Sequence, residues 1–276
     1  MDDVVVVRYG EIFLKSEYVR RKFKDLLARN ILYKLGANGL EAELTHSRHR
    51  IFLITSKPRA CARLTCEVFG VSSTSPAKRT ESEIGNLEEY TARYAGENVG
   101  SAKTFACRVK RLDYPIDSQT LESRIGARIQ KLTKLKVDLT DPDLKVEVDI
   151  RSDTAYVFHE RLKGLGGLPY GSQKSLAATV NSPLDVLACW LMMGRGCKIN
   201  PCGVSQYLDH LSKYADASYK TYQSLDEALT QPDVYGRVSS DLVEKITHPR
   251  RSPPTYYPLC LLTPDQINQL RILAKI

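Results

Sequence analysis

The chain has 276 residues, of which 42% are hydrophobic and 26% are charged, and its formal net charge is +8 at pH 7. This composition is ordinary for a soluble globular protein, and the length predicts two or three domains. The longest apolar run, 186–193, is far shorter than the roughly 20 residues of a membrane-spanning helix. The acidic start, Met1-Asp2-Asp3, leads directly into a predicted strand. We therefore expect no signal peptide, no membrane segment and a cytoplasmic protein.

The basic surplus is concentrated near the N-terminus, where residues 1–59 hold 12 Lys and Arg against 7 Asp and Glu. Such a surplus favours a polyanionic partner, although solubility alone explains it equally well. The seven cysteines show no Cys-x-x-Cys spacing and no nearby histidine at a zinc-ligand interval, so we expect no metal site. Cys197 and Cys202 are the only pair for which a sulfur-carrying role is considered.

The first segment alternates strands and helices. A β-branched run at 4–7 predicts a buried strand, and an apolar stripe over 17–35 predicts a helix that ends at Gly36. Two strands at 41–44 and 50–54 follow, and then a helix at 58–68. This order predicts a small ferredoxin-like α+β domain over 1–72.

The middle segment predicts a second α+β domain over 73–165. After a polar stretch at 78–86 come a helix at 87–95 and a strand at 104–109. Ser118 is the expected N-cap of the next helix. Two strands, 144–150 and 155–158, close the domain. The first of them alternates regularly, which predicts one solvated sheet face.

The last segment, 171–276, has the order of half a doubly wound α/β domain. Residues 172–193 are interpreted as a buried strand followed by an amphipathic helix. A strand at 198–204 and a helix at 206–214 come next. Thr263-Pro264-Asp265-Gln266 predicts the capping box of a terminal helix. At about 105 residues, this domain is short for a complete enzyme domain of that kind.

Three motif groups identify a family. The opening, Arg8 to Lys15, reads Arg-Tyr-Gly-Glu-Ile-Phe-Leu-Lys, and the middle blocks span 107–118 and 137–147. The flanks Gly166–Gly171 and Leu191–Gly196 and the closing segment 254–267 follow. The chain thereby resembles the tRNA 4-thiouridine synthetase family, the thiamine-biosynthesis sulfurtransferases, along its whole length. The resemblance implies a ferredoxin-like domain, a THUMP domain and an adenine nucleotide alpha-hydrolase-like α/β domain, in a multidomain protein of α+β and α/β class.

In that family the THUMP domain holds tRNA by its single-stranded 3′ end, which makes tRNA the expected partner. The candidate RNA-binding residues here are Arg8, Lys15, Arg108, Lys110, Arg111 and Lys163. Arg108 and Lys110 alternate with Val109 and so point to one face of their strand. Without the resemblance, a solvated strand end would be the preferred interpretation. Arg8 and Lys15 could instead pair with Glu11 or Glu17. The aliphatic stem of Lys163 could instead lie along apolar surface.

The family's ATP loop, Ser-Gly-Gly-x-Asp-Ser-Pro, has no counterpart in this chain. Residues 172–193 contain no glycine, whereas a phosphate-binding loop needs residues that tolerate positive φ. Thr179, Val180, Asn181 and Ser182 stand in its place as a degenerate nucleotide loop. Asn181-Ser182-Pro183 resembles the end of the motif but lies three residues too far from Leu191. We therefore expect no cofactor and assign no catalytic residue.

Three hypotheses follow. The leading one is a tRNA-binding protein without ATP-pyrophosphatase activity of its own, which presents tRNA to a partner thiolation enzyme. The second is an active ATP-dependent tRNA 4-thiouridine synthetase with a remodelled loop, so whether the chain is an enzyme stays open. The third is a non-catalytic scaffold that forms a homodimer or docks a partner through its α/β domain.

Overall fold

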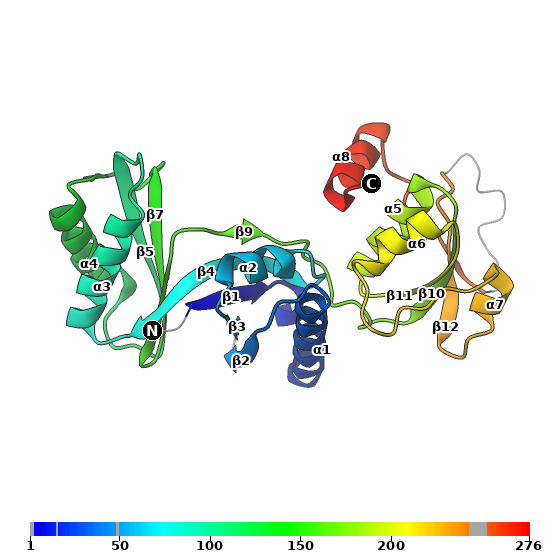
Figure 1. Ribbon diagram of the computed structural model, residues 1–276, viewed down its shortest axis with the longest axis horizontal. Coiled ribbons are helices and arrows are strands. Elements are labelled where there is room, and N and C mark those ends of the chain that lie inside the picture. Colours follow the sequence, from blue (N-terminus) through cyan, green and yellow to red (C-terminus); the bar gives the residue numbers. More distant parts are fainter. Residues whose placement is uncertain (1–2, 15, 48–49, 243–252) are drawn as a thin grey trace. The chain divides into compact units, whose positions relative to one another are not determined.

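The computed structural model describes residues 3–14, 16–47, 50–242 and 253–276 (Figure 1). It divides into two compact units. The first contains residues 1–7, 40–63 and 74–162, and the second contains 8–39, 64–73 and 163–276. Each unit is described on its own.

The first unit is built on a mixed sheet. Its strands are β1 (Asp3–Tyr9), β2 (Glu43–Ser47), β3 (Arg50–Ile54), β4 (Val71–Glu81), β5 (Thr104–Leu112), β6 (Lys136–Val137), β7 (Leu144–Arg151) and β8 (Thr154–Phe158). The strand order is β2-β3-β1-β4-β8-β7-β5-β6, and β9 (Leu162–Lys163) pairs with β4. β1 and β3 are antiparallel, whereas β5 and β7 are parallel. The short helix α2 (Pro58–Cys66) follows β3.

Two helices cover one face of this sheet. α3 (Ile84–Glu97) and α4 (Ser118–Thr133) pack against each other and against the strands (Figure 1). Their buried residues, such as Ile125, share a core with Val109 and Val148. Because side chains alternate across a strand, the intervening residues point to the opposite side, which we call the distal face. Phe52, Tyr156 and Phe158 form a second apolar cluster there, together with Val4, Val6 and Ala77.

The second unit contains a four-stranded parallel sheet. Its strands are β10 (Ser175–Val180), β11 (Lys198–Gly203), β12 (Val234–Val238) and β13 (Thr255–Tyr256), in the order β11-β10-β12-β13. Its helices are η1 (Glu11–Leu14), α1 (Glu17–Gly36), α5 (Pro183–Gly194), α6 (Ser205–Ser212), α7 (Leu225–Leu229) and α8 (Pro264–Ala274). The core joins α5 residues such as Leu187 and Trp190 to Leu176 and Ile199 of the strands. The parallel order β11-β10-β12-β13, with helices between successive strands, agrees with the doubly wound α/β class expected for this segment.

The glycine-rich flanks around α5 have a packing role. Gly167 has a φ of +73° and lies so close to the carbonyl oxygen of Gly194 that a Cβ atom would overlap it. The next N–H, that of Leu168, donates to the same oxygen at 3.0 Å. The turn therefore caps the C-terminal end of α5. These glycines are required by the backbone, independently of any phosphate.

Several sequence predictions need correction. The polar stretch from residue 78 is the end of β4, which begins at Val71. The pattern concealed this strand because its buried positions include Thr74 and Ser75. The N-cap of α4 is Asp117, whose carboxylate accepts from Thr120 N–H at 2.9 Å, and Ser118 is already helical. The alternating strand 144–150 does not have a fully solvated face, since Asp149 is 1% exposed. The elements α7 and β12 were not predicted, whereas β13 lies in the closing segment 254–267, where the family resemblance implied a strand.

Candidate nucleic-acid interface

Four side chains form a row across the distal face of the first unit. Arg79 of β4 pairs in register with Tyr156 of β8, and Tyr156 pairs with Asp149 of β7. Asp149 in turn pairs with Lys110 of β5. Register partners on adjacent strands point to the same side of a sheet, so residues from four separate segments lie side by side. Arg79 and Lys110, at the two ends of the row, are exposed.

Asp149 is the buried centre of the row and binds two guanidinium groups. Arg151 donates from Nε to Oδ1 at 2.7 Å and from Nη2 to Oδ2 at 3.1 Å. The Nε atom of Arg50, on β3, lies 3.3 Å from Oδ2. The side chains of Arg50 and Arg151 are only 17% and 14% exposed. This carboxylate therefore holds both arginines in fixed positions.

Positive charge exceeds negative charge around Asp149. Burial lowers the pKa of Arg50, and the like charges of Arg151 and Arg161 lower it further, against the opposing effect of Asp149. We call Arg50, Arg79, Lys110, Arg151 and Arg161 the basic cluster. Two of these cations share the buried carboxylate of Asp149, and the other three add charge, so the cluster leaves a net positive field that attracts a polyanion.

An aromatic pair lies within the basic cluster. The rings of Phe52 and Tyr156 are stacked, with centroids 4.2 Å apart and an interplanar angle of 14°. Burial raises the pKa of Tyr156, so its hydroxyl stays protonated at neutral pH. Both rings are buried, at 4% and 8% exposed, so the pair supports the strands that carry the cations and leaves contact with nucleic acid to the charged side chains.

The predicted RNA-binding residues are divided between different environments. Lys110 belongs to the basic cluster, and Arg108 lies on the same face of β5. The Nη2 of Arg108 donates to the carbonyl oxygen of Leu139 at 2.7 Å, and the Nη1 of Arg111 donates to that of Tyr114 at 2.7 Å. These bonds fix both guanidinium groups at the edge of the domain.

The other three candidates do not join this group. The side chain of Arg8, on β1, is buried, at 6% exposed. Lys163 is exposed on β9. Both belong to the second unit. Lys15 lies outside the described residues.

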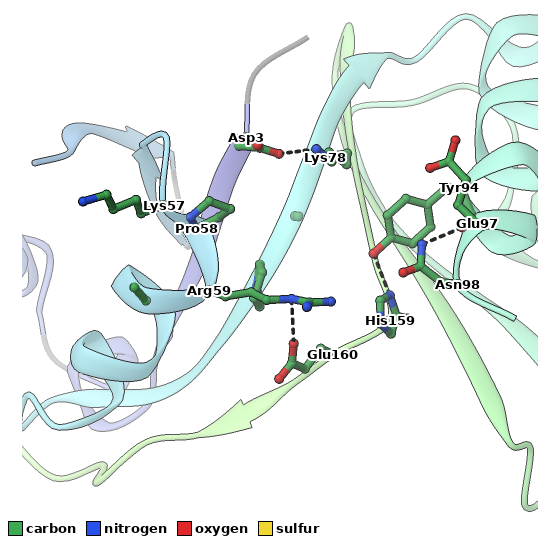
Figure 2. Close-up of a pocket in the computed structure, with 13 residues that line it drawn as sticks. Asp3, Lys57, Pro58, Arg59, Lys78, Tyr94, Glu97, Asn98, His159 and Glu160 are labelled. Atoms are coloured by element: carbon green, nitrogen blue, oxygen red, sulfur yellow. Dashed lines mark hydrogen bonds and ion pairs between the residues drawn. The ribbon is translucent and has the colours of Figure 1, made fainter. Parts of the chain in front are cut away.

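The first unit also has a cavity of about 590 Å³ on its helical side (Figure 2). It lies between the start of α2, which supplies Lys57 and Arg59, and the end of α3, which supplies Tyr94. The Tyr94 hydroxyl and Nδ1 of His159 are 2.7 Å apart, and Figure 2 shows the two side chains pointing toward each other. Arg59 extends toward Glu160, with 4.0 Å between Nε and Oε2.

The cavity is electrostatically balanced. Its three cations, Lys57, Arg59 and Lys78, face three carboxylates, Asp3, Glu97 and Glu160. The hydrogen bond to Asp3 raises the pKa of Lys78, and burial lowers that of His159. At neutral pH, His159 is therefore an uncharged partner of Tyr94. The cavity offers ring edges and hydrogen-bonding groups to a small polar group, whereas the surplus of charge lies on the distal face.

The degenerate nucleotide loop is a tight turn in the second unit. Thr179 and Val180 are the last residues of β10, and Ser182 is the N-cap of α5, so the turn consists of Asn181 and Ser182. The described residues with φ in the left-handed region include none of these four. The N–H of Asn181 and the hydroxyl of Ser182 both donate to Asp185. This turn does not fit the phosphates of ATP.

Neither of the two candidate sulfur-carrying cysteines is suited to sulfur transfer. Cys197 lies just before β11, at the opposite end of β10 from the turn, and burial raises the pKa of its thiol. Cys202 is buried beside Thr179. A reactive cysteine requires the opposite shift, toward the thiolate.

Apart from Lys110, the basic cluster escaped prediction from sequence because its members come from four strands and one loop with no common motif. The only local signal was charge in the strands: Lys78-Arg79 at the end of β4 and Arg151 directly after an alternating strand. Such residues are usually solvated. Only the register of the sheet brings them to one buried carboxylate.

Comparisons with known proteins give a consistent result. The ThiI ferredoxin-like domain model matches residues 4–75, and the THUMP domain model matches residues 81–160. A probable tRNA sulfurtransferase of Methanobrevibacter smithii is 31% identical over 242 residues, which are 85% of this chain and 60% of the relative. One from Methanosarcina acetivorans is 36% identical over 221 residues, 76% of this chain and 53% of the relative. The chain thus spans only part of the length of these relatives.

Two solved structures share the fold over nearly the whole chain. PH1313 from Pyrococcus horikoshii has a TM-score of 0.88 at 26% identity, and the match covers 99% of this chain and 100% of that one. A 4-thiouridine synthetase, in a complex with RNA and bound ATP, has a TM-score of 0.80 at 17% identity and covers 100% and 84%. The second likeness is one of fold alone. In the part of the chain that the structure describes, no helix is long and apolar enough to cross a membrane.

Proposed function

Since the chain belongs to the tRNA 4-thiouridine synthetase family, we propose that it binds tRNA through the distal face of its first unit. The observation that carries this proposal is the basic cluster, in which exposed and half-buried cations outnumber the carboxylates of Asp149 and Glu147 on the same face. The THUMP match at residues 81–160 covers β5, β7 and β8, the strands that carry Lys110, Asp149, Arg151 and Tyr156.

The physical argument assigns different roles to the cations. Arg50 and Arg151 are bound to Asp149 and present guanidinium groups in a fixed orientation, which suits phosphate oxygens. Arg79 and Lys110 are exposed at the two ends of the row and supply charge that is accessible to solvent. Tyr156, only 8% exposed, packs on Phe52 between them and supports this part of the sheet. A single-stranded end of an RNA molecule, whose phosphates are accessible, fits such a surface. We therefore assign the single-stranded 3′ end of tRNA to it.

We further propose that the chain binds tRNA without an ATP-pyrophosphatase activity of its own and presents it, in the cytoplasm, to a partner thiolation enzyme. The two-residue turn between β10 and α5 supports this. It lacks the glycines that a pyrophosphate loop needs, and the N–H of Asn181 is already bound to Asp185, so it cannot stabilise the pyrophosphate released by adenylation.

Filter binding of labelled tRNA to the wild-type chain tests the proposal. Because phosphate contacts release counterions, we expect the affinity to fall by at least about tenfold between 50 and 200 mM salt, as for a protein with several phosphate contacts. A chain that binds no tRNA at 50 mM salt, or binds it equally at both concentrations, would contradict the proposed function.

A further inference from the structure

The turn between β10 and α5 lies where a doubly wound fold binds its ligand. From β10 the chain passes through α5 to β11 on one side, and later returns to β12 on the other side of β10. The strand order reverses at this point, so a crevice opens at the carboxyl ends of β10 and β12. A cavity of about 250 Å³ occurs there, and its lining includes Thr179, Asp185 and Ser240.

A carboxylate of the protein itself occupies the hydrogen-bond donors of this turn. Oδ2 of Asp185, in the first turn of α5, accepts from the N–H of Asn181 at 3.1 Å and from the hydroxyl of Ser182 at 2.8 Å. Its Oδ1 accepts from the hydroxyl of Ser240, which follows β12, at 2.5 Å. Backbone and hydroxyl donors converging at a helix N-terminus are the groups that bind a phosphate in related architectures.

The local hydrogen bonds within this turn form an ordinary helix cap, and the start of α7 shows the same kind of cap. There Ser224 accepts from the N–H of Glu227, and Glu227 accepts from the N–H of Gln223. Ser182 and Asp185 repeat this local pattern at α5. Asp185 differs in its additional bond to Ser240, which comes from the other side of the crevice. Capping alone does not require this third bond.

The charges that line the cavity oppose a bound polyanion. Among the described residues that line the cavity, Asp185 and Asp241 are carboxylates and Arg237 is the one guanidinium. Nε of Arg237 already donates to the hydroxyl of Thr255 at 2.8 Å. The side chains that face the space are therefore, on balance, negative, and phosphate groups are repelled.

We propose that the Asp185 carboxylate takes the position of a phosphate in the β10–α5 turn and bridges the crevice to Ser240, so that nucleotides are excluded by an anion of the chain itself. This inference rests on the proposed function, which it deepens by naming the residue responsible for the loss of nucleotide binding. The missing glycines leave the turn short, and Asp185 occupies the donors that remain.

Isothermal titration calorimetry with magnesium pyrophosphate, and separately with magnesium ATP, tests this on three full-length proteins: wild type, Asp185→Asn and Asp241→Asn. The Asp185 variant keeps the shape of the side chain and removes its charge. The Asp241 variant removes a charge from the same cavity but not from the turn. We expect Asp185→Asn to bind pyrophosphate at least about tenfold more tightly than both other proteins. Circular dichroism checks folding, and Asp185→Ser replaces Asp185→Asn should that variant not fold.

The outcomes separate this inference from the proposed function. If Asp185→Asn binds pyrophosphate no more tightly than Asp241→Asn, the role of Asp185 is refuted, while tRNA binding without ATP chemistry stands. If the wild-type chain already binds magnesium ATP as tightly as Asp185→Asn does, both the inference and the proposed absence of ATP chemistry are wrong.

Discussion

The double variant Arg79→Gln/Lys110→Gln is expected to bind tRNA roughly tenfold to a hundredfold more weakly than the wild type. Both side chains are exposed on the distal face, at the two ends of the row that passes through Tyr156 and Asp149. Their loss removes two cations, so the slope of log affinity against log salt should become shallower by about 1.5. Fluorescence anisotropy with labelled tRNA at several salt concentrations measures both quantities.

The control is Lys131→Gln/Lys134→Gln. It removes two exposed charges at the end of α4, the helix that covers the other face of the same sheet. We expect it to change the affinity less than about threefold. Equal losses in the two double variants would show that overall charge governs binding, and would refute the placement of RNA on the distal face.

Replacement of Asp149 by alanine is expected to lower the free energy of unfolding of the first unit by about 3 kcal/mol. Asp149 is 1% exposed and holds the largely buried guanidinium groups of Arg50 and Arg151. Without the carboxylate, two like charges remain together in a poorly solvated place, and the cost of their burial is no longer offset. Urea denaturation, followed by near-ultraviolet circular dichroism, measures the change.

Glu147→Ala is the matched control for this variant, since Glu147 lies two residues earlier on β7 and points to the same face. Its change in unfolding free energy should stay under about 1 kcal/mol, because Glu147 is only half-buried and, among the described residues, holds no buried guanidinium group. A similarly small change for Asp149→Ala would mean that water or a rearranged partner replaces the carboxylate. The fixed orientation assigned to the two arginines would then be wrong.

Local patterns of the sequence predicted most of the secondary structure. The apolar stripe over 17–35 corresponds to α1, and the capping box at Thr263 begins α8, with both reciprocal hydrogen bonds present. The interpretation of 172–193 as a strand and a helix is confirmed by β10 and α5. These elements were predictable because their apolar positions repeat with the period of the element and their ends carry capping residues.

The unpredicted parts depend on tertiary contacts. β4 contains Thr74 and Ser75 at fully buried positions, so its sequence lacks the apolar alternation of a half-buried strand. β12 is short and becomes a strand through pairing with β10 and with β13. In each case the free energy comes from neighbours distant in sequence, which a local pattern does not contain.

The candidate site shows the same division. Lys110 was a candidate because it alternates with Val109 in a strand of the THUMP segment, and the structure places it in the basic cluster. Arg50 and Arg151 had no such signal. Asp149 belonged to a strand face predicted to be solvated, and only the register of β7 with its neighbours reveals that it is buried. Because charged residues are usually exposed to solvent, a buried charged residue cannot be identified from its residue type alone.

Hydrogen–deuterium exchange of the whole chain, with and without saturating tRNA, tests the central claim most directly. If the distal face binds tRNA, the amides of peptides covering 78–81, 107–112 and 147–156 should exchange more slowly in the complex. The turn at 179–186 should exchange at the same rate, because Asp185 already occupies its donors. Unchanged exchange in the three peptides, under conditions in which tRNA is bound, would contradict the account.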